Sequence, residues 1–147
     1  YTVVIIQSTP LELRQLSASW ASLKKDIVMP TLTLYHNPRC SKSRMALETL
    51  ENSGREFTTV LYLEAPPSVG ALEALCHKLG MTPQQLLRPK ETVLAELGLS
   101  IASDLSRSEW LKVMTENPIL IERPIVVLDD KAVVGRPPEN VGELLAE

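Results

Sequence analysis

Cys40 is the residue whose setting in the sequence most favours chemistry. It lies where a predicted strand gives way to a predicted helix, and the free N–H groups and dipole of a helix N-terminus stabilise an anion. Arg39, Lys42 and Arg44 surround it in the sequence, and His36 precedes it on the same loop. A thiolate in such a place has a depressed pKa, and inert cysteines are seldom found in an exposed basic loop. We therefore predict that Cys40 is a reactive thiol.

The other cysteine, Cys76, has a different setting. With Leu72, Leu75 and Leu79 it forms the apolar face of a predicted helix, so we interpret it as a core residue. His77 lies off that face and is interpreted as a surface residue. No second histidine or carboxylate motif is found at a metal-ligand spacing from it, so the sequence predicts no metal site.

Ser43 occupies the position at which a Cys-x-x-Cys motif would carry its second, resolving thiol. An internal disulfide relay from that position is therefore excluded. The longer cysteine-to-arginine loop of phosphotyrosine phosphatases does not fit either, because Ala46 is found where its arginine would fall. Electrons for a redox step must come from outside the chain.

Three arginines each precede a proline: Arg88, Arg123 and Arg136. The proline biases the arginine backbone away from the helical region and helps to fix where the side chain emerges. Taken singly, each arginine would be interpreted as a solvated surface residue. Taken as a set, three guanidinium groups suit a tetrahedral oxyanion, which they can bind bidentately.

The elements that must position these residues can be followed along the chain. Alternating or β-branched apolar residues predict strands at residues 31–35, 57–61, 124–128 and 132–134. Helical spacing bounded by Ser, Thr, Gly and Pro predicts helices at residues 41–53, 68–79, 82–87, 92–97, 106–116 and 138–145. This order predicts an α/β fold: a thioredoxin-like mixed four-stranded sheet with an inserted all-helical subdomain at about residues 66–118.

Residues 1–28 precede this pattern and carry no grouped reactive side chains. Met29 is the first methionine and is interpreted as the natural start. We predict that residues 1–28 are an N-terminal appendage and that residues 29–147 are the working domain.

Composition excludes several classes of protein. The 147 residues carry 15 Lys and Arg against 18 Asp and Glu, a net charge of -3, which leaves no uniform basic surface for nucleic acid or anionic lipid. Two cysteines cannot form the disulfide frame of a small secreted domain. We therefore expect a protein of the reducing cytoplasm. The longest apolar run near the start, residues 3–6, is far shorter than the roughly 20 residues that span a bilayer.

With these residues identified, the sequence resembles the glutaredoxin-dependent arsenate reductase (ArsC) family, thioredoxin-fold proteins with a helical insertion. The resemblance covers residues 29–147 and is strongest to the short, chromosomally encoded YfgD-like branch. The motifs that carry it are residues 35–44 (YHNPRCSKSR), 86–88 (LLR), 118–127 (PILIERPIVV) and 135–139 (GRPPE).

The resemblance implies that Cys40 is the nucleophile and that His36 helps to hold it as a thiolate. It implies that Arg88, Arg123 and Arg136 bind arsenate and stabilise the intermediates, and that the bond before Pro124 is cis. The rest of the loop would support the nucleophile: Asn37, Arg39, Ser43 and Arg44.

The implied reaction is attack of the thiolate on arsenic(V) with loss of water, addition of glutathione, reduction by glutaredoxin and release of arsenite. No cofactor would be bound, and glutathione would be a co-substrate. We expect a monomer whose partners are arsenate, glutathione and glutaredoxin, with no nucleic acid or membrane among them.

Two other functions are compatible with the same fold. The Spx regulators, a sister branch, act as binding modules that dock on RNA polymerase, but they commonly carry a Cys-x-x-Cys switch, and Ser43 counts against it here. A general glutathione-dependent thiol oxidoreductase would have no oxyanion substrate, and the three arginines count against that alternative.

Overall fold

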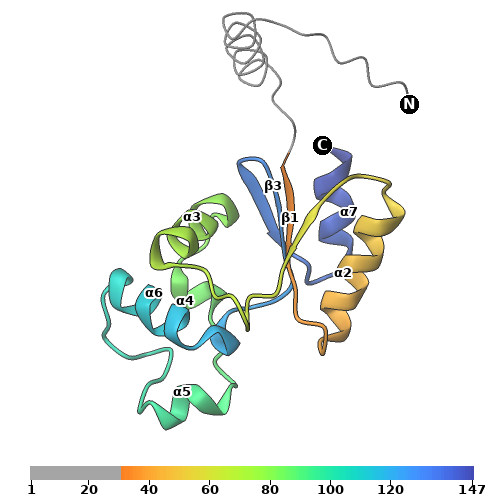
Figure 1. Ribbon diagram of the computed structural model, residues 1–147. Helices are drawn as coiled ribbons and strands as arrows, with labels where there is room; N and C mark the ends of the chain where they lie inside the picture. Colours follow the sequence, from red (N-terminus) through yellow and green to blue (C-terminus); the bar gives the residue numbers. More distant parts are fainter. Residues whose placement is uncertain (1–30) are drawn as a thin grey trace, which may run out of the picture. The chain divides into compact units, whose positions relative to one another are not determined.

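Four short strands form one mixed sheet in the computed structural model, which describes residues 31–147 (Figure 1). The strands are β1 (Leu32–Tyr35), β2 (Thr58–Val60), β3 (Ile125–Leu128) and β4 (Lys131–Val134). Their order is β2-β1-β3-β4, with β1 parallel to β2 and antiparallel to β3, and with β3 antiparallel to β4. This confirms the predicted sheet. The predicted appendage, residues 1–28, lies outside the described residues.

The helices divide between the two faces of the sheet (Figure 1). One face carries α2 (Ser41–Asn52) and α7 (Glu139–Ala146). The chain between β2 and β3 forms the helical subdomain: α3 (Val69–Leu79), α4 (Pro83–Leu86), α5 (Thr92–Glu96), α6 (Arg107–Glu116) and a 3₁₀ turn, η1 (Pro118–Leu120). Every predicted helix is present within two residues of its predicted ends, whereas η1 was not predicted.

Alternation along β1 explains why it lies inside the sheet. Leu32 and Leu34 are buried and pack with the apolar sides of α2 and α7. In the register of the sheet, Leu34 lies opposite Val126 of β3, which points to the same face. Tyr35, the last residue of β1, pairs with Val60 of β2 and with Ile125 of β3. The loop that follows β1 therefore starts from a fixed position.

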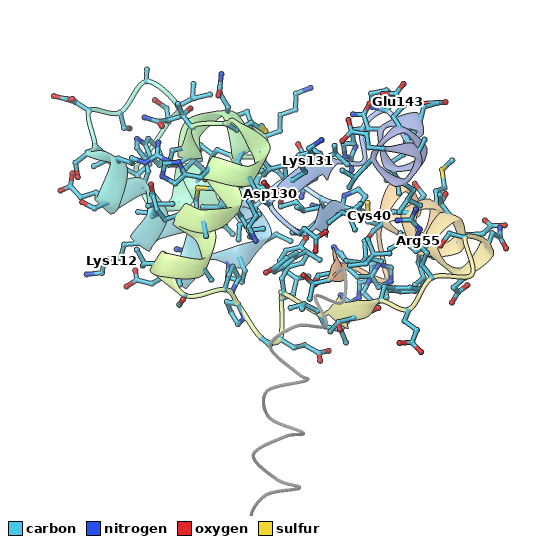
Figure 2. All side chains as sticks on the ribbon, turned by 90° about the horizontal axis from the view of Figure 1, so that it is seen from above. Cys40, Arg55, Lys112, Asp130, Lys131 and Glu143 are labelled. Atoms are coloured by element: carbon cyan, nitrogen blue, oxygen red, sulfur yellow. The ribbon has the colours of Figure 1, made fainter. Side chains whose placement is uncertain are left out.

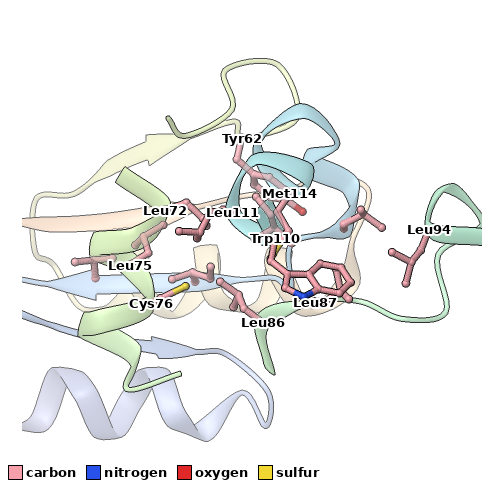
Figure 3. Packing of buried hydrophobic residues seen from close by; sticks show 14 residues of the cluster. Tyr62, Leu72, Leu75, Cys76, Leu86, Leu87, Leu94, Trp110, Leu111 and Met114 are labelled. Atoms are coloured by element: carbon pink, nitrogen blue, oxygen red, sulfur yellow. The ribbon is translucent and has the colours of Figure 1, made fainter. Parts of the chain in front are cut away.

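A second, larger cluster fills the other face of the sheet (Figure 3). Trp110 of α6 is fully buried there among residues of α3, such as Leu72 and Cys76. Residues of β3, Ile125 and Val127, close the cluster from the sheet. Burial of side chains of this size is the main stabilising contribution to such a subdomain, so α3 and α6 are fixed relative to the sheet.

Local signals set the ends of these helices. Ser68 accepts a hydrogen bond from the backbone N–H of Ala71 at the start of α3, and Ser106 forms a capping box with Glu109 at the start of α6. The left-handed Gly80 ends α3. No helix within residues 31–147 is long and apolar enough to cross a membrane.

Candidate active site

Cys40 lies immediately before α2, where the loop from β1 reaches the helix. Its backbone is extended (φ -95°, ψ 123°), and it occupies the N-cap position without a side-chain cap. Its N–H donates to the carbonyl oxygen of Asn37 (3.0 Å), and its own carbonyl oxygen accepts from the N–H of Arg44 (3.0 Å). Cys40 is 8% exposed, so the prediction of an exposed loop cysteine is wrong. The loop folds back onto α2, and Arg136 lies against the sulfur.

The pKa of the Cys40 thiol is lowered from its ordinary value. Burial is the largest single influence and acts in the opposite direction, because it removes the thiolate from water. The backbone N–H of Ser43, the side chain of Arg123 and the backbone N–H of Lys42 together outweigh burial. The helix N-terminus therefore contributes as the sequence predicts, and the fold adds a cation from a distant segment.

The basic side chains next to Cys40 in the sequence have other surroundings. Arg39 and Arg44 are exposed, and Nη1 of Arg44 donates to the carbonyl oxygen of Pro38 (3.0 Å). Neither is among the influences that lower the pKa of Cys40. The cation that lowers the pKa of the thiol is Arg123, which the sequence places far from the loop.

Ser43, a buried residue of α2, forms hydrogen bonds with the loop that precedes Cys40. It is fully buried, its Oγ accepts the N–H of Asn37 (2.9 Å), and the same Oγ lies 2.6 Å from Nδ1 of His36. The side chain of Asn37 in turn accepts the N–H of Arg39 (3.0 Å). Burial lowers the pKa of His36 and favours the neutral ring. The hydrogen-bond partner of this ring within residues 31–147 is Ser43. His36 is therefore buried beneath the loop and contacts Ser43, the residue that supports the loop.

The three arginines predicted to bind an oxyanion come from separate segments of the chain. Arg123 precedes β3 and Arg136 follows β4, so the hairpin brings them together, and Nε of Arg136 donates to the carbonyl oxygen of Arg123 (2.6 Å). Nη2 of Arg136 donates to Sγ of Cys40 at 3.5 Å. Arg88 arrives from the helical subdomain, where its N–H donates to the carbonyl oxygen of Leu120 (2.8 Å).

Glu122 joins these arginines and was missed in the sequence. Its Oε1 lies 3.2 Å from Nε of Arg136 and 3.8 Å from Nε of Arg88, and it accepts the backbone N–H of Arg123 (3.1 Å). Glu91 forms a further ion pair with Nη1 of Arg88. Arg88 therefore contacts the carboxylates of Glu91 and Glu122, and through Glu122 it lies near Arg136. The only signal in the sequence was that Glu122 directly precedes Arg123.

Tyr62 is a second residue that sequence reasoning missed. It is 1% exposed, and burial raises its pKa to about 12 despite the opposing influence of Arg123 and Asn37. Cys40 also raises the pKa of Tyr62. Within residues 31–147 neither the Tyr62 hydroxyl nor Nε and Nη1 of Arg123 has a hydrogen-bond partner. Buried donors of this kind can be satisfied by a bound acceptor.

Two cis bonds flank the hairpin, Arg123-Pro124 and Arg136-Pro137. The first confirms what the family resemblance implied, and the second was not predicted. Gly135 packs against Pro124: its N–H donates to the proline carbonyl oxygen (2.9 Å), and a Cβ at this position would lie 2.7 Å from Cγ of Pro124. A side chain at Gly135 would therefore push Pro124 and the neighbouring Arg123 out of place.

The remaining candidates from the sequence lie in the helical subdomain. Cys76 lies fully buried on the apolar face of α3, and burial raises the pKa of its thiol. His77 is exposed and pairs with Glu73 (3.0 Å). Both interpretations are confirmed. Within the described part of the chain, no group of three or more His, Cys, Asp or Glu side chains is placed to hold a metal ion.

The fold and site together define a class. A mixed four-stranded sheet, a cysteine at the start of the helix after the first strand, and a cis-proline before the third strand are the features of a thioredoxin-like protein with cysteine chemistry. Figure 2 shows Cys40 on the α2 side of this sheet.

Comparison with known proteins identifies the family. A sequence model of the ArsC family matches residues 35–144. The chain is 48% identical over 113 residues to the uncharacterized protein YfgD of Escherichia coli strain K12, covering 76% of this chain and 94% of that protein. It is 45% identical over 116 residues to an arsenate reductase of Haemophilus influenzae, covering 78% and 99%. The solved structure of an arsenate reductase from Vibrio cholerae aligns with a TM-score of 0.73 at 46% identity, covering 77% and 96%. The chain therefore belongs to the ArsC family, and its similarity to YfgD supports the predicted branch.

Proposed function

We propose that this protein reduces arsenate to arsenite, with Cys40 as the nucleophile. The observation that carries the proposal is the contact of 3.5 Å between Nη2 of Arg136 and Sγ of Cys40, because it puts a cation beside a thiol of lowered pKa. A dianionic oxyanion approaches a thiolate only where cations offset the repulsion. Relatives named arsenate reductases, at 40–46% identity, support arsenate as the oxyanion.

The substrate would lie between Cys40 and the arginines. The buried guanidinium of Arg123 and the hydroxyl of Tyr62 are donors without partners, and they would bind two oxygens of the anion. Arg136 would bind a further oxygen when it turns from the sulfur to the substrate. Arg88 would complete the cationic set from the side of the helical subdomain, and His36 would maintain the loop that presents the thiolate.

The first step would be attack of the Cys40 thiolate on arsenic(V). A sulfur–arsenic bond forms, and one oxygen leaves as water after it takes up two protons, so arsenic remains in the +5 state. A thiol of glutathione then displaces a second oxygen in the same way. Two electrons pass to arsenic when two thiols end as a disulfide, and arsenite leaves.

The electrons would come from outside the chain. Position 43 carries a serine, and Cys76 is fully buried in the other cluster, so neither offers Cys40 a resolving thiol. Glutathione would therefore be the co-substrate and glutaredoxin the protein that reduces the mixed species, with no bound cofactor. These thiols are kept reduced in the cytoplasm, where we expect the protein to act as a monomer without nucleic-acid or membrane partners.

The test is arsenate-dependent consumption of NADPH in the presence of glutathione, glutaredoxin and glutathione reductase. Wild type is expected to turn over, Cys40→Ser is expected to lose turnover, and Cys76→Ala is the matched control that keeps it. Equal, negligible rates for wild type and Cys40→Ser would overturn the proposal. Cys40-dependent reduction of a small disulfide, without arsenate turnover, would assign a general glutathione-dependent oxidoreductase instead.

A further inference from the structure

A single carboxylate oxygen contacts the guanidinium groups of two of the arginines assigned to the oxyanion. Oε1 of Glu122 lies 3.2 Å from Nε of Arg136 and 3.8 Å from Nε of Arg88, and it accepts the backbone N–H of the adjacent Arg123 at 3.1 Å. Because Arg88, Glu122 and Arg136 come from separate segments, this oxygen is a point at which those segments meet.

The contacts are directional. Arg136 uses its Nε for Glu122 and for the carbonyl oxygen of Arg123, which leaves Nη2 directed at Sγ of Cys40. The backbone of Glu122 is itself fixed, because its N–H donates to the carbonyl oxygen of Leu86 (2.9 Å). Nε–H and Nη2 lie on the same edge of the planar guanidinium, so contacts that hold Nε also set the direction of Nη2 toward the sulfur.

These ion pairs are unevenly buried. The side chains of Glu122 and Arg88 are 28% and 21% exposed, whereas that of Arg136 is 38% exposed. Exposed ion pairs contribute little to stability, so the contacts of Glu122 bear on the orientation of the arginines more than on the stability of the fold.

We propose that Glu122 is a positioning residue: it holds the guanidinium groups of Arg88 and Arg136 near each other, and it directs Nη2 of Arg136 toward the oxyanion site at Cys40. This inference deepens the proposed function and rests on it for the identity of the oxyanion.

Positioning and simple charge neutralisation predict effects of opposite sign. A carboxylate that only neutralised the arginines would weaken anion binding and raise the pKa of Cys40, so its removal would strengthen binding and lower that pKa. A carboxylate that positions Arg136 has the reverse effect on binding: its removal releases Nη2 of Arg136 from its direction toward Cys40, so anion binding weakens.

The experiment measures the pH dependence of Cys40 alkylation, and its protection by sulfate, an anion that thiols do not reduce under these conditions. Glu122→Ala is expected to weaken protection about tenfold, because Arg136 loses the carboxylate that holds its guanidinium, and is not expected to lower the alkylation midpoint. Glu122→Gln keeps an acceptor oxygen and the backbone contacts, so it is expected to retain most of the protection. Glu143→Ala, which removes the same charge from the exposed side of α7 (Figure 2), is the matched control.

Each outcome decides the proposal. Tighter sulfate protection in both Glu122 variants, with a lower alkylation midpoint, would overturn it in favour of charge neutralisation, and unchanged behaviour in both would also overturn it. Equal weakening in both would support it and assign the positioning to the charge. If the chain does not reduce arsenate while Glu122→Ala still weakens sulfate protection, the proposed function fails and the role of Glu122 is retained.

Discussion

Nη2 of Arg136 lies 3.5 Å from Sγ of Cys40 although 96 positions of sequence separate the two residues. The sheet brings the two residues together. Cys40 lies between β1 and α2, and Arg136 follows the hairpin of β3 and β4, which pairs with β1. The reactivity of the thiol is therefore a property of the assembled sheet as well as of the cysteine loop.

The lowered pKa of Cys40 predicts alkylation at unusually low pH. Below its pKa the thiol is protonated and reacts slowly, and above it the thiolate reacts, so the midpoint of the rate against pH is expected below the roughly 8.5 of an ordinary cysteine. Arg123→Gln removes a cation that favours the thiolate, so its midpoint is expected at higher pH. Lys112→Gln, an exposed charge on α6, is the control; an identical shift there would mean that only net charge matters.

The packing of Gly135 against Pro124 predicts opposite effects for two glycine substitutions. In Gly135→Ala the new methyl group would lie 2.7 Å from Cγ of Pro124, and overpacking of this kind costs about 1–3 kcal/mol of unfolding free energy. In Gly142→Ala, on α7, the methyl group meets nothing within 4 Å, and loss of a helical glycine stabilises by about 0.5–1 kcal/mol. Urea unfolding of both variants measures the difference, and a neutral Gly135→Ala would contradict the close packing.

Loss of the Ser43 hydroxyl is expected to lower the unfolding free energy. Ser43→Ala leaves the buried N–H of Asn37 without its acceptor and removes the partner of His36, at a cost of about 1–3 kcal/mol. Ser41→Ala, at an exposed position one residue after Cys40, is the control and is expected to change the unfolding free energy little. If the two substitutions had equal effects in urea, the Ser43 network would have no stabilising role.

Removal of the buried Tyr62 hydroxyl is expected to weaken anion binding without lowering the unfolding free energy. Tyr62→Phe removes a donor that has no partner within residues 31–147, so the unfolding free energy is expected to stay the same or to rise. The same change removes a donor for the oxyanion, so sulfate protection of Cys40 is expected to weaken about tenfold. Tyr35→Phe, on the half-buried end of β1, is the comparison. A clear loss of stability in Tyr62→Phe would show that the hydroxyl has a structural partner.

Much of the fold could be predicted because its signals are local. Strand alternation at Leu32 and Leu34, helix caps at Ser68 and Ser106, and the stop at Gly80 all depend on neighbours within a few residues. The position of Cys40 at a helix N-terminus could be predicted for the same reason, and the backbone N–H groups of that turn do lower its pKa.

The parts of the site that were missed depend on contacts between distant segments. A glutamate beside an arginine is common on a protein surface, so the sequence around Glu122 does not show that its carboxylate contacts the guanidinium groups of Arg88 and Arg136. The buried hydroxyl of Tyr62 and the second cis bond, before Pro137, likewise belong to the assembled fold. The burial of Cys40 was missed for the same reason: Arg136, which donates to its sulfur, belongs to another part of the chain.

The place of Arg123 and Arg136 near the end of the chain has a consequence during protein synthesis. A growing chain that has passed the ribosome only as far as the helical subdomain contains Cys40 but lacks the hairpin that brings the cations to it. The thiol of such a nascent chain lacks the Arg123 contribution that lowers its pKa. That contribution arises only after β3 and β4 have been translated and have paired with β1.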